Sequence, residues 1–183
     1  IGLSIHAFVI IPLIIKLFVK VSPLSVAKDV FTSLTTGFTT ASSAATLPIL
    51  MEDVRKKLKV SNKVASFVLP LGITINMDGT ALFQCVAAVF IAQIYGVPLS
   101  LASLGIIVFI AILSSVGAAA IPSAGIITLA MILTAIGVPL EGTAIILGID
   151  RVLDMLRTTV NLWGNTTASL VLTKWLGEGA YEN

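Results

Sequence analysis

The sequence predicts an all-α integral membrane protein built as an inverted repeat of a re-entrant helical hairpin plus a broken transmembrane helix. Of the 183 residues, 57% are hydrophobic and 11% are charged, and the mean hydropathy is +1.08, as is typical of membrane-embedded chains. Apolar tracts cover residues 1–20, 64–97 and 99–149, and about 20 apolar residues suffice to cross a bilayer. Small residues and prolines interrupt the chain at two matching places. The net charge of +2, carried by clustered cations, argues against a nucleic-acid surface.

Residues 1–21 are predicted to be the end of a transmembrane helix. The tract is apolar and finishes with Lys16 and Lys20, which are expected to anchor it at a basic membrane surface. It begins inside apolar sequence without an initiator methionine, so we expect a fragment of a longer protein. His6 and Trp175 are interpreted as packing residues or interfacial anchors, without a role in a site.

Residues 22–59 are predicted to form the first re-entrant hairpin. A Ser-Pro pair opens the segment, which is a helix-start signature. The helical pattern breaks in the small residues of 39–48, and a second helix is expected after Pro48, ending in the cations of 55–59. Each arm is too short to cross a membrane comfortably, so the hairpin is expected to enter and leave on the same side.

Residues 60–97 are predicted to be a transmembrane helix broken at Asn76-Met77-Asp78-Gly79-Thr80. Asp78 is the only charged residue between Lys63 and Glu141. An ionised side chain in hydrocarbon costs from roughly 3 to more than 10 kcal/mol, so it persists only beside a partner, a cavity or an ion path. The break also frees backbone carbonyls, which together with the carboxylate suit an alkali cation.

The second half of the chain repeats the first. Residues 98–138 are predicted to form a second re-entrant hairpin, because the small residues and proline of 114–125 interrupt an apolar tract. Residues 139–178 are predicted to form the last transmembrane helix, and 179–183 a tail. An offset of 72 residues relates three pairs: Ser42 and Ser114, Ser43 and Ser115, Asp78 and Asp150. Paired interruptions of this kind indicate a transporter's binding site near the middle of the membrane, and helix packing through small residues is the alternative.

The distribution of cations predicts that the two halves are inverted. The joints at 95–98 and 137–140 carry no cation, whereas those near Lys20 and at 55–63 do. Cytoplasmic loops are enriched in lysine and arginine. The cations expected on the cytoplasmic side are Lys16, Lys20, Lys28, the 55–63 cluster and Lys174. The first hairpin then enters from the cytoplasm and the second from outside.

The last helix carries a polar stripe. Its members are Asp150, Asp154, Arg157, Asn161 and Asn165. At about 100° per residue they fall within an arc of roughly 80°. Arg157 suits a two-point grip on a ligand carboxylate, and Asp154 suits an ammonium group, which together indicate an acidic amino acid. Asn161 and Thr80 could donate to a second carboxylate. An internal ion pair between Asp154 and Arg157 is the alternative.

These motifs resemble the dicarboxylate/amino acid:cation symporter family, which includes excitatory amino acid transporters and prokaryotic glutamate and aspartate carriers. The matching motifs are Ser42 through Pro48, Asn76 through Thr80, Gly117 to Gly125, and Asp150 through Asn165. The resemblance covers residues 1–178 and the C-terminal part of the family only. It implies the glutamate transporter fold: a transport core that moves as an elevator against a scaffold made by preceding helices, with hairpin two as a gate, in a homotrimer held together by those helices.

The residues and the resemblance together assign two sets of contacts. Substrate contacts are expected at Ser42, Ser43, Thr80, Ile121, Pro122, Gly125, Asp150, Asp154, Arg157, Thr158 and Asn161. Cation contacts are expected at Gly72, Thr74, Asn76, Asp78, Ser115, Val116, Ala118, Asn161 and Asn165. The coupling ions are transported, so no cofactor is expected.

Asn165 departs from the family pattern in a way that bears on the coupling ion. Sodium-coupled relatives have an aspartate where Asn165 stands, and an amide there removes one charge from a cation site. Bacterial relatives with this asparagine include proton-coupled glutamate carriers. The animal branch carries a proton on a glutamate where this chain has Gln84. The resemblance thus implies coupling to protons, sodium or both.

The function indicated is symport of glutamate or aspartate with cations across the inner cell membrane, by a multi-pass protein in contact with lipid. The first alternative is a C4-dicarboxylate:cation symporter. A remote alternative is an intramembrane aspartyl protease, because Asp78 and Asp150 could share a proton as a catalytic dyad. A passive channel is the third. We expect a transporter and no enzyme.

Overall fold

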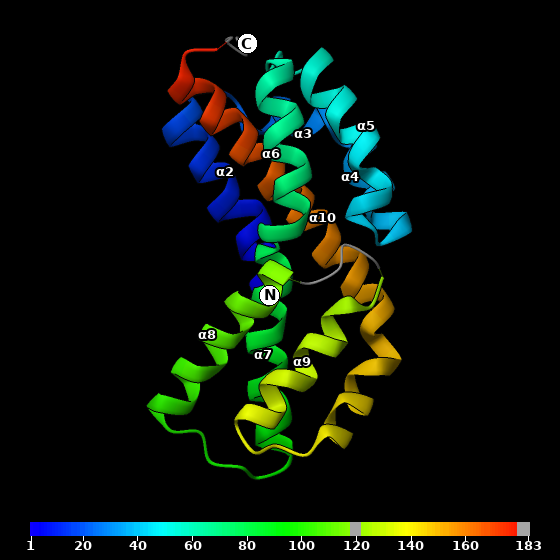
Figure 1. Cartoon of the computed structure of the whole chain (residues 1–183), viewed down its shortest axis with the longest axis vertical. Coiled ribbons are helices and arrows are strands. Elements are labelled where there is room, and N and C mark those ends of the chain that lie inside the picture. Colours follow the sequence, from blue (N-terminus) through cyan, green and yellow to red (C-terminus); the bar gives the residue numbers. More distant parts are fainter. Residues whose placement is uncertain (118–121, 179–183) are drawn as a thin grey trace.

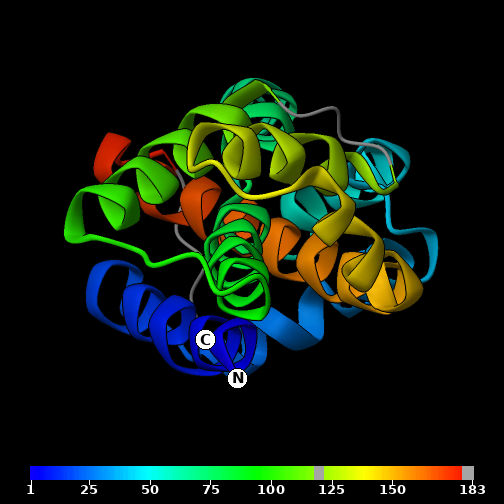
Figure 2. The ribbon, with the colours of Figure 1, turned by 90° about the horizontal axis from the view of Figure 1, so that it is seen from below.

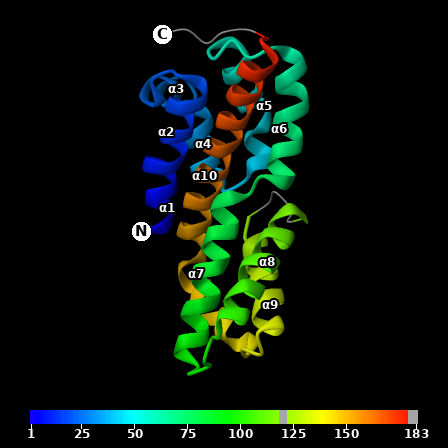
Figure 3. The same cartoon turned by 90° about the vertical axis from the view of Figure 1, so that its left-hand side faces the viewer.

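The structure, a computed structural model, describes residues 1–117 and 122–178. Every regular element in those two ranges is a helix, so the all-α prediction is confirmed. Figure 1 shows an elongated molecule, and Figure 3 shows that its longest helix, α10 (Thr143–Leu176), runs through most of its length. The short 3₁₀ turn η3 (Leu140–Gly142) leads into α10.

The first helical segment is continuous although its pitch changes three times. It consists of α1 (Gly2–Ile5), η1 (His6–Ile10), α2 (Ile11–Ile14) and η2 (Ile15–Val19), of which η1 and η2 are π-helical. Pro12 has no N–H to donate to the preceding turn, and local π-helical adjustment is a common response to proline in apolar helices. The segment ends at Lys20, which has a φ of 66°.

Hairpin one differs from the sequence-based expectation in both arms. It consists of α3 (Pro23–Asp29), α4 (Phe31–Thr40) and α5 (Ser43–Lys56). The first arm is divided at Val30, and the second arm begins before Pro48. Ala41 ends α4 in the left-handed conformation, and the Ser42 hydroxyl accepts a hydrogen bond from the Ala45 N–H at 3.2 Å. This N-cap allows α5 to begin at Ser43. The helix then continues through Pro48, although the proline cannot donate one of the backbone hydrogen bonds.

The next segment is broken where the sequence predicts a break. Two helices, α6 (Asn62–Ile75) and α7 (Asp78–Ile94), are separated by Asn76 and Met77, whose ψ values of 69° and 56° are not helical. Asp78 and Gly79 lie in the first turn of α7, which places a carboxylate at the positive end of a helix dipole.

Hairpin two consists of α8 (Leu101–Gly117) and α9 (Ala124–Ala135). Hairpin one lies in the upper half of Figure 1 and hairpin two in the lower half, and the C-terminal end of α4 and the N-terminal end of α9 both lie near the middle. Seen from below, the first segment lies on one side of α7 and hairpin two on the other (Figure 2). The break between α6 and α7 therefore lies between the two hairpins.

Two separate hydrophobic cores hold this arrangement. One contains residues of the first segment, hairpin one, α6 and the end of α10, including Ile15, Leu50 and Leu162. The other contains residues of α7, hairpin two and the beginning of α10, including Ile91 and Leu129. The polar residues of α10 between Asp150 and Asn161 lie where one core gives way to the other.

The surface is apolar where a soluble domain would be polar. Phe8 is 80% exposed and Ile127 is 72% exposed, whereas Arg157 is 1% exposed. Two stretches of the described residues, Gly2–Val19 and Asn62–Ile94, have the length and composition to cross a membrane. A lipid environment accounts for this distribution, since it favours apolar side chains outside and polar groups inside.

A polar contact joins the end of α10 to the beginning of α6, and it predicts a small pH effect. The Ser61 hydroxyl donates to Glu178 at 2.8 Å and the Lys63 ammonium lies 3.4 Å from the same carboxylate. These two groups hold the pKa of Glu178 below its usual value of 4.5. Because the pKa of Glu178 is lower in the folded than in the unfolded state, its ionised form stabilises the fold at pH values above the ordinary glutamate pKa. This stabilisation is lost as the pH falls through the pKa of the folded state.

Glu178→Gln should therefore lower Tm slightly at pH 7 and leave it unchanged at low pH. Thermal unfolding of the detergent-solubilised protein from pH 7 to pH 3 measures this difference. Glu141→Gln is the matched control, because Glu141 is exposed and makes no ion pair among the described residues. A Tm difference that persisted undiminished at pH 3 would contradict the assignment.

Candidate functional site

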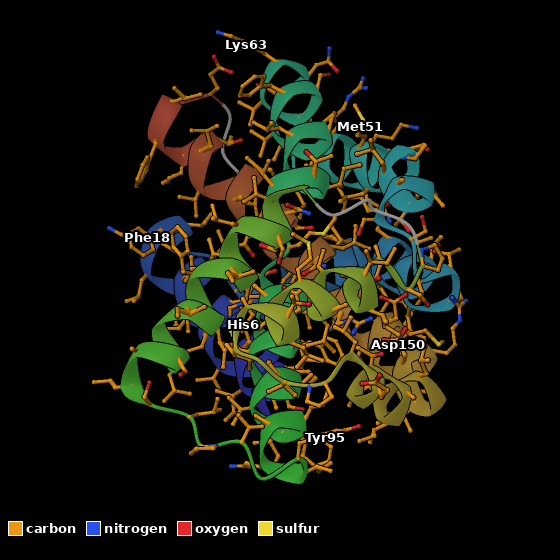
Figure 4. The ribbon with its side chains drawn as sticks, turned by 60° about the horizontal axis from the view of Figure 1, so that its bottom comes forward. His6, Phe18, Met51, Lys63, Tyr95 and Asp150 are labelled. Carbon is orange, nitrogen blue, oxygen red and sulfur yellow. The ribbon has the colours of Figure 1, made fainter. Side chains whose placement is uncertain are left out.

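A buried polar cluster lies between the two hydrophobic cores. The predicted stripe contributes to it from one face of α10, and all five stripe residues are buried: Asp150, Asp154, Arg157, Asn161 and Asn165. Figure 4 places Asp150 and His6 between Lys63 and Tyr95, which lie at opposite ends of the molecule. The cluster is thus far from both ends of the α6–α7 segment.

Arg157 is held by two carboxylates of its own helix. Its Nη2 donates to Asp150 at 2.9 Å and to Asp154 at 2.8 Å. The internal ion pair considered from the sequence is therefore present, with Asp150 as an additional partner. It leaves the Nε and Nη1 of Arg157 and one oxygen of Asp150 without a hydrogen-bond partner among the described residues. Buried polar groups are rarely left unpaired, so these atoms are available to a ligand.

Hairpin two and α7 close around the Arg157 guanidinium. The Ser123 N–H donates to the other oxygen of Asp154 at 2.8 Å. A Cβ on Gly125 would lie only 3.3 Å from the guanidinium carbon, so a glycine allows α9 to approach this closely. The ring of Phe83 stacks on the guanidinium at 3.9 Å. Phe83 was not predicted as a site residue, because an aromatic residue in an apolar helix carries no distinguishing signal.

Asn161 ties α10 to the first turn of α7. Its side-chain oxygen accepts from the Gly79 N–H at 2.8 Å, and its nitrogen donates to the Thr80 hydroxyl at 3.0 Å. The structure thus brings Thr80 and Asn161 together, as the predicted substrate site requires. A Cβ on Gly79 would lie 3.0 Å from the backbone oxygen of Arg157, so the helices approach closely here.

A second group of polar residues gathers at the break between α6 and α7. The Asn76 amide donates to the Asn165 side-chain oxygen at 3.0 Å, and the nitrogen of Asn165 has no partner among the described residues. Asp78 lies beside Gly164, where a Cβ would come within 2.8 Å of its carboxylate. The second group therefore shares α10 and α7 with the first.

His6 belongs to this second group, so its interpretation as a packing residue or anchor was incomplete. Its Nε2 lies 2.6 Å from the Asp78 carboxylate. The two side chains line a cavity of about 390 Å³, together with Asn76, Gly164 and Trp175 among others. Nothing in the sequence indicates that the first segment lies against α7, so spacing could not have identified this partner.

The aspartyl protease alternative is wrong on this geometry. Asp78 pairs with His6, and Asp150 pairs with Arg157. The two carboxylates therefore have different partners and do not share a proton as a catalytic dyad would.

The remaining predicted substrate residues lie around the cluster or outside the described ranges. Ser42 caps α5, and Ser43 is buried at the first position of that helix. Thr158 faces α4, where a Cβ on Gly37 would lie 3.6 Å from its methyl group. Pro122 is exposed, and Ile121 lies outside the described residues. Within the described residues, neither Ser43 nor Pro122 makes a direct hydrogen bond to the stripe.

The predicted cation residues do not all converge. Gly72 abuts the side chain of Asn165. Thr74 and Ser115 each donate to a carbonyl of their own helix, to Leu71 and Ile112. Val116 is exposed, and Ala118 lies outside the described residues. Within 1–117 and 122–178 no group of three or more His, Cys, Asp or Glu side chains could hold a metal ion, so a cation here would rely on amide and carbonyl oxygens with Asp78.

The cluster is suited to binding a small zwitterion with an extra carboxylate. The free Nε and Nη1 of Arg157 can donate to a carboxylate, while Asp150 and Asp154 can accept from an ammonium group. Buried from water, these contacts are stronger than they would be at a surface. Among the described residues of the cluster, no nucleophile is paired with a base.

The chain matches the sodium:dicarboxylate symporter family over residues 1–175. It is 45% identical over 166 residues to human excitatory amino acid transporter 2, covering 91% of this chain and 29% of that protein. It is 40% identical over 173 residues to mouse excitatory amino acid transporter 3, covering 94% and 33%. The mouse neutral amino acid transporter B(0) is 43% identical over 175 residues, covering 96% and 32%.

The chain thus spans about a third of the length of these relatives. Relatives named for excitatory and for neutral amino acids have similar identities to it. Overall sequence identity therefore does not indicate the substrate, which has to be inferred from the side chains of the site.

Proposed function

Because the chain belongs to the sodium:dicarboxylate symporter family, we propose that its protein is a secondary active symporter that takes up acidic amino acids with cations. The family is one of transporters, so the chain is not an enzyme, and it is part of a membrane protein. The observation that carries the proposal is the buried Arg157, whose Nε and Nη1 have no partner among the described residues beside two carboxylates.

The proposed substrate is glutamate or aspartate. Its side-chain carboxylate accepts a charge-assisted hydrogen bond from the free Nη1 of Arg157. Nη2, which a two-point grip would also need, already donates to Asp150 and Asp154. The ammonium group of the substrate binds Asp154. Thr80 and Asn161, which already contact each other at 3.0 Å, receive the α-carboxylate.

The proposed coupling ions are sodium, protons or both. The family description and the oxygen-rich group at Asn76, Asp78 and Asn165 support sodium. The amide at Asn165 supports a smaller number of sodium ions than a carboxylate would bind, since it lacks the charge that offsets a cation's desolvation.

The broken backbone supports an alternating-access mechanism. We infer that the two hairpins are re-entrant, with hairpin two as the gate, and that the core assigned to 22–178 moves as an elevator against helices supplied by the rest of the protein. Relatives three times as long leave room for such a scaffold and for assembly as a homotrimer. The bacterial branch resemblance supports an inner-membrane location.

A C4-dicarboxylate without an amino group is the second candidate substrate. It is favoured by the ion pairing of Asp154, which both Arg157 and the Ser123 N–H already contact. An Asp154 neutralised in this way would not need a ligand ammonium.

Asp154→Ser separates the two candidates. If Asp154 binds the ammonium group, this variant should lose about tenfold or more in apparent glutamate affinity, the loss of one charge-assisted hydrogen bond, and should change little towards succinate. Competition of unlabelled glutamate and succinate against labelled substrate measures the two affinities. An unchanged preference would count against the ammonium contact and favour the dicarboxylate.

Binding to the purified full-length protein tests the proposal most simply. Isothermal titration with L-glutamate, L-aspartate, succinate and L-glutamine, each with and without sodium, should show the tightest binding for one of the two acidic amino acids. Tighter binding of glutamine than of glutamate would contradict the proposed role of Arg157.

A further inference from the structure

Gln84 lies in the interior of α7 with 0% exposure and makes two hydrogen bonds that leave its own helix. Its Nε2 donates to the Thr128 hydroxyl, and its Oε1 accepts from the Ser114 hydroxyl at 3.2 Å. Thr128 belongs to α9 and Ser114 to α8. One amide thus contacts both arms of hairpin two through its two ends.

The surroundings make these contacts consequential. The hydroxyl of Thr128 can accept from Gln84 because it donates to the Gly125 carbonyl at 3.0 Å, so the contact continues to the beginning of α9. Gly125 in turn packs against the Arg157 guanidinium. The other packing between α7 and hairpin two is apolar, through residues such as Ala88, Ala111 and Leu129, and apolar contacts do not fix a register as directional hydrogen bonds do.

We propose that Gln84 is a positioning residue that clamps both arms of hairpin two to α7 and so sets how often the hairpin separates from the site. Its significance as a gate control rests on the proposed transport function, but the clamp itself is a property of the fold. When the hairpin separates, the buried amide must lose both partners, so separation is disfavoured until water replaces them.

The clamp predicts effects specific to each arm. Thr128→Val removes the partner on α9, Ser114→Ala removes the partner on α8, and Gln84→Leu removes both. Thr128→Val and Ser114→Ala each leave one end of the buried Gln84 amide without a partner, and Gln84→Leu removes the amide. The fraction of molecules in which hairpin two is separated from α7 should therefore rise about tenfold for one lost hydrogen bond.

Pulsed electron spin resonance on the full-length protein in lipid nanodiscs measures this directly. In a cysteine-free background that includes Cys85→Ala, one label at the exposed Val86 of α7 is paired with a label at Ile127 of α9 or at Phe109 of α8. Thr128→Val should broaden the Val86–Ile127 distance distribution more than the Val86–Phe109 one. Ser114→Ala should do the reverse, and Gln84→Leu should broaden both.

Matched controls keep the test independent of general destabilisation. Gln93→Leu on α7 and Thr134→Val on α9 make the same chemical changes at exposed positions outside the clamp, and Ser103→Ala on α8 does so at a half-buried position. These three should leave both distributions unchanged. Equal broadening by the clamp and control variants, or none by Gln84→Leu, would overturn the proposal. The readout needs no transport, so failure of the clamp and failure of the transporter assignment are distinguishable.

Discussion

Arg157→Ala is expected to abolish uptake of acidic amino acids. The guanidinium is 1% exposed and bonded to Asp150 and Asp154, with its remaining N–H groups free among the described residues. Truncating one partner of a buried, hydrogen-bonded charge pair costs roughly 2–5 kcal/mol, which corresponds to a loss of about 30-fold to several thousand-fold in kcat/KM. Initial rates of labelled glutamate uptake in proteoliposomes measure the loss.

The variant also leaves two buried carboxylates without their cation, which destabilises the fold. Arg157→Lys keeps the charge and loses only the planar fork, and it should fold while binding glutamate more weakly. Arg55→Ala is the matched control, since Arg55 is exposed on α5. Full glutamate uptake by folded Arg157→Ala would remove the assigned role of this residue.

Asn165→Asp is expected to increase the apparent affinity for sodium about tenfold or more. The side-chain oxygen of Asn165 accepts a hydrogen bond from the Asn76 amide at 3.0 Å, while its side-chain nitrogen has no partner within the described ranges. Replacing that nitrogen by a carboxylate oxygen exchanges an unpaired donor for a charged acceptor. A cation bound nearby would then gain a full opposite charge.

The sodium dependence of Tm and of uptake measures this increase. Asn62→Asp makes the same change at an exposed position on α6 and should leave the sodium dependence unaltered. If Asn165→Asp instead lowered Tm equally in sodium and in potassium, no cation would bind within reach of position 165, and the proposed sodium group would be wrong.

Local chemistry made several features predictable. An isolated Asp78 beside Asn76 and Gly79 predicts a broken helix. Such residues are costly in an apolar membrane segment unless they and the broken backbone line a cavity or bind an ion. The stripe on α10 followed from helical spacing alone, and all its members are buried together. Both predictions depend on residues close in the chain.

Features that depend on tertiary contacts or on capping were missed. Pro48 indicates a helix boundary from the sequence, but the Ser42 cap starts α5 earlier. His6 pairs with a residue 72 positions away, and Gln84 bonds to two residues on other helices. A sequence records the polar character of these side chains but not which neighbour satisfies it.

Labelled glutamate uptake by the full-length protein in proteoliposomes, with an inward sodium gradient and an inward proton gradient imposed separately, tests whether the protein is a symporter. A symporter should accumulate glutamate above the external concentration under at least one gradient, lose it when that gradient is dissipated, and show competition by aspartate. Glutamate that only equilibrates, whichever gradient is imposed, would contradict a symporter and indicate a passive channel.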